Sequence, residues 1–460
     1  MKPITIFIIF LFSLPSLNFA QGIAISREHP QFWEYDGQTI LLLGGSVEDN
    51  LFQIEHLEEH LDVLKAAGGN YVRCTMSSRD EGNVWPFLQQ EDGKYDLNQW
   101  NDEYWNRFES FLKQTAERDI VVQIEIWATF DFYRENWAVN PFNPKNNKNY
   151  DAQRSKLPAE VPTHPIYTDN NFFRSVPSQM SLLKVLEYQQ KYVDKLLEHS
   201  LKYDHVLYCM DNETSVTAEW GKFWSAYIKK VARETAGKTV YTTEMWDPWD
   251  LNHIAHRATF DHPEIYDFVD ISQNNHNKGQ LHWDNGYRQI MKIKHSEVVR
   301  PVNNIKVYGA DGNNFGHNNQ DGIERFIRNV LLGTASTRFH RPNSGLGLND
   351  TAQAVIKSMR MLTNAYDHFH AEPMTELLSE REENDAYCRA LPGKAYAVYF
   401  TNGETMRLNL SAMTGTAQVQ WLNVLQAEWT NPVPIEVGNQ VSLQAPAEGN
   451  WVALIVMKDQ

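Results

Sequence analysis

The chain has 460 residues, enough for one large domain of about 250–350 residues and a smaller one. Its formal net charge of −16 argues against a nucleic-acid partner, because phosphate binding needs a basic surface. Its three cysteines, Cys74, Cys209 and Cys388, show no metal-binding spacing, and two of them lie in apolar strand-like runs. We therefore expect neither cysteine chemistry nor a metal or other cofactor.

Residues 1–20 have the three regions of a secretory signal peptide. Lys2 precedes an apolar run at residues 4–14, and a small-residue ending leads to Ala20 before Gln21. No cysteine lies near this cleavage point, which argues against lipid attachment, and no later apolar run is long enough to cross a bilayer. The sequence predicts an exported, soluble protein without a membrane partner, whose mature chain begins near Gln21.

Eight strand-like runs follow, most of them succeeded by a helical pattern. They are residues 40–44, 71–76, 120–128, 206–210, 240–245, 268–272, 305–309 and 335–339. Leucines recur at helical spacing between them, as in residues 54–67 and 181–203. This alternation implies parallel strands with crossover helices, and eight such units form a closed barrel. We predict an α/β fold with a (β/α)8 TIM barrel at residues 21–375.

Two segments depart from the barrel pattern. Residues 129–180 form a long stretch rich in Asn and Pro, and loops of that length are usually functional, so we expect one wall of a substrate cleft there. After about Met374, three strand-like runs occur with no helical segment among them. They predict a small antiparallel β-sandwich accessory domain at residues 376–460.

The fourth strand-like run carries the clearest chemical signal. It ends abruptly in Asp211, Asn212 and Glu213 after a run typical of a strand buried on both faces. A carboxylate at the carboxyl end of a barrel strand lies where barrel enzymes carry out catalysis. Glu213 is therefore a candidate catalytic acid, or else an acidic residue that supports the start of the next helix. Asn212 could bind a sugar hydroxyl or simply form a turn.

A second motif lies in residues 64–73, LKAAGGNYVR, where a helix stops at glycine and a strand carries Arg73. With Asn212 and Glu213 ending strand four, it resembles the clan A glycoside hydrolases, which have a G-x-N-x-x-R pattern before strand two and an Asn-Glu acid/base on strand four. The resemblance implies hydrolysis of glycosidic bonds in a carbohydrate substrate. It also implies that Glu213 is the general acid/base and that Arg73 lies in the site.

The resemblance narrows to the apiosidase-like glycoside hydrolases, many of which carry a collagenase label. Residues 32–44 are similar to their opening hairpin and first strand, and residues 140–147, NPFNPKNN, to a motif in their third loop. Residues 408–415 and 419–422 are similar to the accessory domain that carries a collagen-binding label. The resemblance thus spans most of the chain after residue 20.

The second catalytic carboxylate is where this chain departs from that pattern. Glycoside hydrolysis needs a proton donor and a second carboxylate that attacks the sugar or activates water. Clan A members end strand seven with Glu, whereas Lys306 occupies that place here, and a protonated lysine cannot be the nucleophile. Asp311 or Glu244 could replace it, and Glu125 on strand three could also reach inward.

Further residues are candidates for substrate binding. Lys306, Arg73, Arg338 and Arg341 would form a basic spot suited to a uronate or a sulfated sugar, or else structural ion pairs. Aromatic and histidine side chains at or beyond strand ends could stack on sugar rings or bind hydroxyls, although each could equally be packing: Trp127, Trp246, His276, Trp283 and His340.

We therefore predict a secreted glycoside hydrolase acting on a plant or algal glycan, with Asp311 or Glu244 as partner of Glu213. Two alternatives belong to other classes. A carbohydrate-binding protein on a glycosidase barrel would explain Lys306. A zinc protease is suggested by His56-Leu-Glu-Glu-His60, which matches H-x-x-E-H, but the same residues fit an amphipathic outer helix, and no third ligand is evident.

Overall fold

The computed structural model describes residues 22–164, 170–313 and 315–458. The predicted signal peptide, residues 1–20, lies outside the described residues. Among the helices of the described part, none is both long enough and apolar enough to span a membrane.

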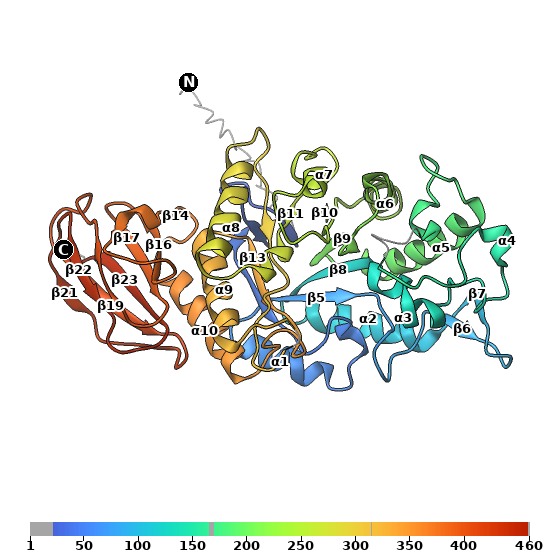
Figure 1. Ribbon diagram of the computed structural model, residues 1–460, viewed down its shortest axis with the longest axis horizontal. Coiled ribbons are helices and arrows are strands. Elements are labelled where there is room, and N and C mark those ends of the chain that lie inside the picture. The colour runs from blue at the N-terminus through green and yellow to red at the C-terminus, as the bar shows by residue number, and fades with distance from the viewer. Residues whose placement is uncertain (1–21, 165–169, 314, 459–460) are drawn as a thin grey trace, which may run out of the picture.

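Eight parallel strands form a barrel at the centre of the molecule (Figure 1). They are β4 (Leu42–Gly45), β5 (Tyr71–Thr75), β8 (Val121–Ala128), β9 (Val206–Asn212), β10 (Thr242–Thr243), β11 (Val269–Asp270), β12 (Val302–Asn303) and β13 (Ser336–Phe339). Six of them pair in the order β10-β9-β8-β5-β4-β13, and β11 pairs with β12. Backbone hydrogen bonds from Asp267 to Thr242 and from Ala335 to Val302 join the two groups. The predicted (β/α)8 barrel is confirmed.

The seventh strand is shorter than predicted and lies earlier in the chain. It covers only residues 302–303, and a single bridge between Val307 and Phe339 continues the pairing. The side chain of Asn304 accepts a hydrogen bond from the backbone N–H of Lys306, at 3.1 Å. This local bond replaces a ladder hydrogen bond and interrupts the strand just before Lys306.

Helices cover the outside of the barrel. They are α1 (Leu57–Ala66), α2 (Asp102–Ala116), α5 (Leu183–Ser200), α6 (Ala218–Val231), the short α7 (Arg257–Phe260), α8 (Gly279–Lys294), α9 (Asn319–Leu332) and α10 (Asp350–Asn364). Their starts follow the sequence: Asn318 and Asp321 form a reciprocal capping box at α9, and the side chain of Asn101 caps α2. Each helix places its apolar side chains against the strands.

A small antiparallel sheet lies at the amino ends of the barrel strands. It consists of β1 (Ile23–Ile25), β2 (Trp33–Tyr35) and β3 (Gln38–Ile40). Trp33 is fully buried, and its indole N–H donates to the Asn303 side chain at 2.9 Å. The hairpin therefore closes this end of the barrel with one large aromatic ring.

The long third loop folds into short elements beside the barrel. It contains α3 (Arg134–Val139) and α4 (Ala152–Ser155), and it lies next to the hairpin of β6 (Phe87–Gln89) and β7 (Tyr95–Trp100), to which a bridge between Tyr95 and Asn147 connects it. Figure 1 shows these elements together at one end of the molecule.

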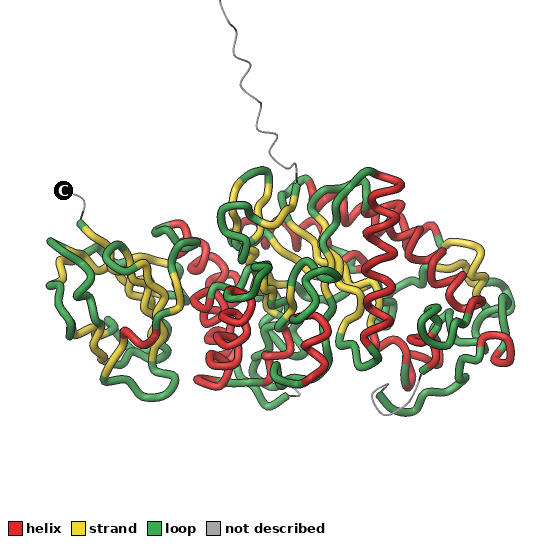
Figure 2. The backbone as a smooth tube through the Cα atoms, turned by 90° about the horizontal axis from the view of Figure 1, so that it is seen from above, coloured by secondary structure: helices red, strands yellow, loops and turns green. Residues whose placement is uncertain are grey.

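The C-terminal region is a sandwich of antiparallel strands at the opposite end of the molecule from the third loop (Figure 2). One sheet contains β14 (Glu372–Pro373), β16 (Ala386–Leu391), β17 (Ala395–Phe400), β23 (Trp451–Met457), β19 (Ala417–Asn423), β20 (Glu428–Trp429) and β21 (Val433–Ile435). The other contains β15 (Leu378–Ser379), β18 (Thr405–Leu408) and β22 (Val441–Gln444). β14 shows that this sheet begins slightly before the predicted boundary at residue 376.

The sandwich packs against the barrel through the outer face of its larger sheet. The ring of Tyr387 packs on that of Trp283 in α8, with centroids 4.6 Å apart, and Ser358 of α10 donates to the carbonyl of Val424. Trp283, a candidate for sugar stacking, therefore belongs to the contact between the two regions.

Candidate active site

Glu213 lies at the carboxyl end of β9 in an unusual backbone conformation. Its φ is 58°, in the left-handed region that costs a non-glycine residue about 1–3 kcal/mol. The next residue, Thr214, forms a parallel bridge with Trp246, so the chain beyond β9 is fixed against the segment after β10. Only 6% of Glu213 is exposed. The fold thus holds a buried carboxylate where barrel enzymes place their chemistry.

Lys306 is the direct partner of Glu213. The Lys306 ammonium donates a hydrogen bond to Glu213 Oε1, and both side chains are buried. Burial by itself would raise the pKa of Glu213, but the charges of Lys306 and Arg73 outweigh it and hold that pKa below its ordinary value. Glu213 is therefore ionised at neutral pH.

A second buried network surrounds Asp49, in the loop after β4. Arg73 lies between Asp49 and Glu125, at 2.8 Å and 2.6 Å, and His340 Nε2 lies 3.2 Å from Asp49. Although burial would raise the pKa of Asp49, Arg73 and His340 keep it well below its usual range. Burial lowers the pKa of His340 to about 3, so its ring is neutral at pH 7.

These two networks line one cleft of about 130 Å³ at the carboxyl ends of the strands. Its lining residues are Asp49, Arg73, Arg79, Phe130, Asn212, Glu213, Lys306, Tyr308, Phe315, His340, Arg341, Asn343 and Ser344. The structure thus brings together six of the predicted site residues, namely Arg73, Asn212, Glu213, Lys306, His340 and Arg341. Phe130 from the long third loop contributes to the wall. Sequence reasoning missed Asp49, although it follows the first barrel strand.

The two sequence candidates for the second carboxylate do not line this cleft. Asp311 is exposed and accepts hydrogen bonds from the backbone and side chain of Asn319, at 3.0 and 2.8 Å. Glu244 is buried on the outer side of the barrel, where it accepts from the Tyr266 hydroxyl at 2.6 Å and faces Gly221 of α6. Burial raises the pKa of Glu244 to about 8. Glu125 is paired with Arg73 inside the barrel.

Asp247 is a carboxyl group near Glu213 that sequence reasoning did not find, although it too is not among the residues that line the cleft. It follows β10, and its backbone N–H donates to the carbonyl of Thr214 at 3.0 Å, directly beside Glu213. Burial, and then the charge of Glu213, raise the pKa of Asp247 to about 7. The pKa values of two neighbouring carboxyl groups are thus shifted in opposite directions, so that Glu213 is ionised at a pH where much of Asp247 still carries its proton, and this suits separate base and acid roles.

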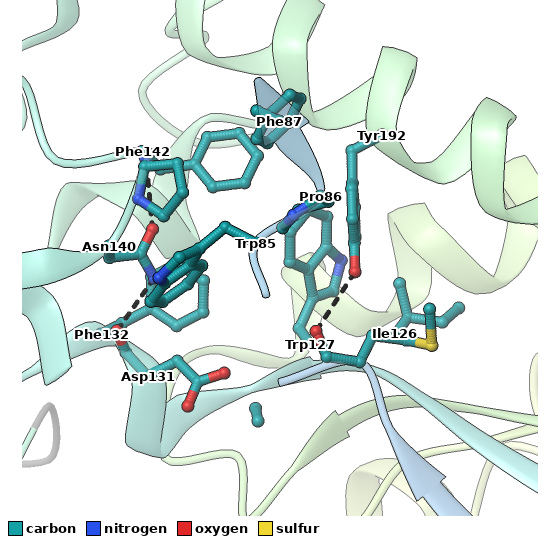
Figure 3. A pocket seen from close by; sticks show the side chains of 13 residues that line it. Trp85, Pro86, Phe87, Ile126, Trp127, Asp131, Phe132, Asn140, Phe142 and Tyr192 are labelled. Carbon is teal, nitrogen blue, oxygen red and sulfur yellow. Dashed lines mark hydrogen bonds between the residues drawn. The ribbon is translucent and has the colours of Figure 1, made fainter. Parts of the chain in front are cut away.

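The aromatic candidates mostly serve as packing. Trp127 lines a small pocket of about 30 Å³ together with Phe132, Phe142 and Tyr192. Figure 3 shows these rings gathered around it. Trp246 is buried and donates its indole N–H to the Thr259 hydroxyl at 2.9 Å. Neither lines the cleft that contains Glu213.

Two other candidates lie just behind the cleft wall. The ring of His276 contacts those of Tyr308 and Phe315, at 5.5 and 5.8 Å between centroids. Arg338 is fully buried and donates to the carbonyl of Ile305, so it braces the segment that carries Lys306.

The H-x-x-E-H segment lies at the start of the outer helix α1, in agreement with its interpretation as part of an amphipathic helix. His60 is buried, and burial lowers its pKa to about 4. Within the described ranges, the one cluster of three side chains that could hold a metal ion contains Glu28, His29 and His370, and so includes neither His56 nor His60. The geometry gives no support to a zinc protease.

Comparisons with known proteins identify the fold. No family model and no curated protein matches the sequence. The structure is similar to one described only as a glycoside hydrolase, with a TM-score of 0.66, 12% identity and coverage of 95% of this chain and 98% of that one. It is also similar to a glycoside hydrolase family 5 structure from Bacteroides vulgatus ATCC 8482, with a TM-score of 0.64, 14% identity and coverage of 95% and 93%.

A third similar structure is a glycoside hydrolase family 5 mannosidase from Rhizomucor miehei, with a TM-score of 0.51 and 12% identity. It covers 74% of this chain and 97% of its own. At these identities the likeness is one of fold. The protein has the barrel fold of glycoside hydrolase family 5 structures, and two of the similar structures match almost the whole chain, C-terminal region included.

Proposed function

We propose that this protein hydrolyses glycosidic bonds at the cleft that contains Glu213. The observation that carries the proposal is the position of Glu213: a buried, ionised carboxylate at the carboxyl end of β9, beside Asn212, in a barrel with the fold of glycoside hydrolases. Fold alone does not determine function, but this side chain gives the fold a reactive group.

The two carboxyl groups would divide the chemistry. The protonated form of Asp247, which its raised pKa of about 7 keeps substantially populated near neutral pH, would give its proton to the oxygen of the leaving sugar as the glycosidic C–O bond breaks. Glu213, ionised, would attack the anomeric carbon or take a proton from the attacking water. This assignment reverses the expected role of Glu213 as general acid, because Lys306 stabilises its charged form.

We further propose export of the protein and a plant or algal glycan as its substrate. The expected preference for an anionic sugar receives less support, since the cations at the cleft are already paired. Arg79 contacts Asp131 at 3.4 Å, and Arg341 contacts Glu48 and Asp80 at 2.9 and 3.2 Å. A neutral sugar would leave these pairs intact. The narrower resemblance to apiosidase-like enzymes stays a prediction.

The test is to incubate the purified protein with neutral and charged polysaccharides and oligosaccharides and to compare it with Glu213→Gln. Glutamine keeps the size of the side chain but removes its charge, so turnover should fall by about 10³-fold or more, while sugar binding remains. The control is Glu428→Gln on β20, far from the cleft in the C-terminal sheet. Equal activity of Glu213→Gln and wild type would refute the proposal.

Lys306 also favours a second candidate, a carbohydrate-binding protein without hydrolysis. In the free protein, the Lys306 ammonium at the position of the expected glutamate forms an ion pair with the ionised Glu213 and balances its charge. Two measurements decide between these candidates: calorimetry detects binding, and an assay of reducing ends detects cleavage. A glycan that binds at the cleft but stays intact after prolonged incubation supports the binding protein. The appearance of new reducing ends supports the enzyme.

A further inference from the structure

We propose that Glu28, His29 and His370 form a binding site for one zinc-type divalent cation, apart from the cleft. Glu28 and His29 lie between β1 and β2, and His370 lies between α10 and β14. One ligand atom from each residue lies within 4.8 Å of the other two. Segments from opposite ends of the barrel sequence thus direct three metal-binding side chains toward one point.

The separations suit a tetrahedral ion. Nε2 of His29 and Nε2 of His370 lie 3.9 and 4.0 Å from Glu28 Oε1. Zinc ligands at about 2.0–2.1 Å in a tetrahedron are about 3.4 Å from one another. Each histidine nitrogen therefore has to come about 0.5–0.6 Å closer to Glu28 Oε1, and all three ligand atoms already lie within 4.8 Å of one another, so side-chain rotation can bring them to one ion.

A neighbouring carboxylate orients His370 for this role. Its Nδ1 donates to Asp367, at 2.9 Å from Oδ2 and 3.0 Å from Oδ1. Because a neutral imidazole with a proton on Nδ1 carries its lone pair on Nε2, the nitrogen that faces Glu28 is free to bind a cation. A carboxylate behind a histidine ligand is the usual outer shell of protein zinc sites.

His29 is held in place by packing. Its side chain is 10% exposed, its ring meets that of His370 edge-on with centroids 4.3 Å apart, and it also contacts Phe369 at 5.8 Å. Its backbone N–H donates to Ser26 Oγ. One wall of the site therefore exists before the ion binds.

The ligand set indicates the kind of ion. Two imidazoles and one carboxylate suit zinc and its transition-metal neighbours better than calcium or magnesium, which prefer oxygen ligands. The charge of a divalent cation would also balance Glu28 and Asp367. The fourth coordination position would be taken by water, because Glu28 and His370 are exposed. The bound ion would clamp the segment before the barrel onto the segment that leads to the sandwich.

The experiment uses the full chain without a polyhistidine tag, stripped of metal with a chelator and titrated with zinc chloride by calorimetry, with the melting midpoint measured in parallel. We expect one zinc ion per chain at this site and a rise of a few degrees in the midpoint. His370→Ala and Glu28→Gln should each weaken binding at least tenfold, and Asp367→Asn about 10–100-fold.

The matched control is His262→Ala. His262 is a partly exposed histidine 2.7 Å from Glu264, and neither belongs to the three-residue cluster, so this variant should bind zinc like wild type. Glu28→Gln guards against misfolding as an explanation, since that side chain is 72% exposed. Absence of zinc binding to wild type, or wild-type affinity in both His370→Ala and Glu28→Gln, would overturn the proposal.

Discussion

Lys306 donates a hydrogen bond to Glu213 inside the barrel mouth, where the two side chains are only 1% and 8% exposed. A cation therefore stands beside the carboxylate at the point where clan A glycoside hydrolases are expected to carry a second glutamate. The cation favours the ionised form of Glu213. The proton needed for catalysis must then come from another group, and the raised pKa of Asp247 makes it the candidate.

Replacement of Lys306 by methionine should destabilise the protein most strongly at neutral pH. The variant leaves a buried carboxylate without its main partner, which costs about 3 kcal/mol in comparable pairs. In wild type, the pKa of Glu213 is lower in the folded state than in the unfolded state, where it is about 4.5. The ionised side chain therefore adds stability at pH values above 4.5, and this stability is lost as the pH falls through the folded-state pKa.

Urea unfolding of wild type and Lys306→Met at pH 7 and pH 4 measures this difference. The deficit should shrink at pH 4, where burial of the unpaired Glu213 favours its neutral form. Lys292→Met, which removes a half-exposed lysine paired with Asp261, should cost less than about 1 kcal/mol at both pH values. A deficit of equal size at pH 4 and pH 7 would argue against the ion pair as its cause.

Activity should depend on pH through two carboxyl groups. Loss on the acidic side should occur below pH 4.5, where Glu213 takes up a proton, and loss on the alkaline side near pH 7, where Asp247 loses one. Asp247→Asn should abolish the alkaline limb and lower turnover by about 10²–10⁴-fold.

The control for that variant is Asp250→Asn, an exposed aspartate in the same loop. Substrates with a good leaving group need less protonation, so Asp247→Asn should lose much less activity on an activated aryl glycoside than on the natural glycan. Equal losses on both substrates would count against Asp247 as proton donor.

The sequence allows prediction of which residues lie at strand ends, but not of whether each side chain faces the cleft or the surrounding helices. Glu213 could be predicted because the end of β9 fixes its height in the barrel, whereas Lys306 lies beyond the end of β12. Glu244, Trp246 and Asp247 occupy one strand end, and neighbouring side chains there point to opposite sides. Glu244 contacts α6 and Trp246 packs against Thr259, whereas Asp247 is close to Glu213. Strand register and twist decide which side chains face the cleft and which face the helices, and a one-residue shift in register exchanges the two sets.

The barrel itself could be predicted because each strand is a short apolar run between helices. The end of the seventh strand could not, since it depends on a hydrogen bond between the Asn304 side chain and the Lys306 backbone. The candidate stacking role of Trp127 was also undecidable in advance. Its ring lies among Phe132 and Phe142 of the third loop and Tyr192 of α5, and only the folding of that loop brings them together (Figure 3).

Glu244→Gln should change the pH dependence of stability rather than catalysis. Burial raises the folded pKa of Glu244 to about 8, so its contribution to stability is complete below about pH 4.5 and is lost as the pH rises toward 8. Glutamine cannot ionise but can still accept the Tyr266 hydrogen bond. Relative to wild type, the variant should gain a few kcal/mol between pH 5 and pH 8 in urea unfolding, with activity retained. Parallel stability curves for the two proteins would contradict the raised pKa.

Gly221→Ala tests the contact between α6 and this carboxyl group. A Cβ atom at Gly221 would lie 1.7 Å from Glu244 Oε2, so the carboxyl must move and the Tyr266 hydrogen bond is disturbed. We expect a loss of about 1–3 kcal/mol in the free energy of unfolding, although alanine is the better helix former. Gly438→Ala, where an added Cβ meets no atom within 4 Å, is the control and should be nearly neutral.

In the double variant Gly221→Ala with Glu244→Ala, the shorter side chain at residue 244 removes the clash, so the two losses in the free energy of unfolding should not add. Full additivity would place the cause of the first loss elsewhere in α6.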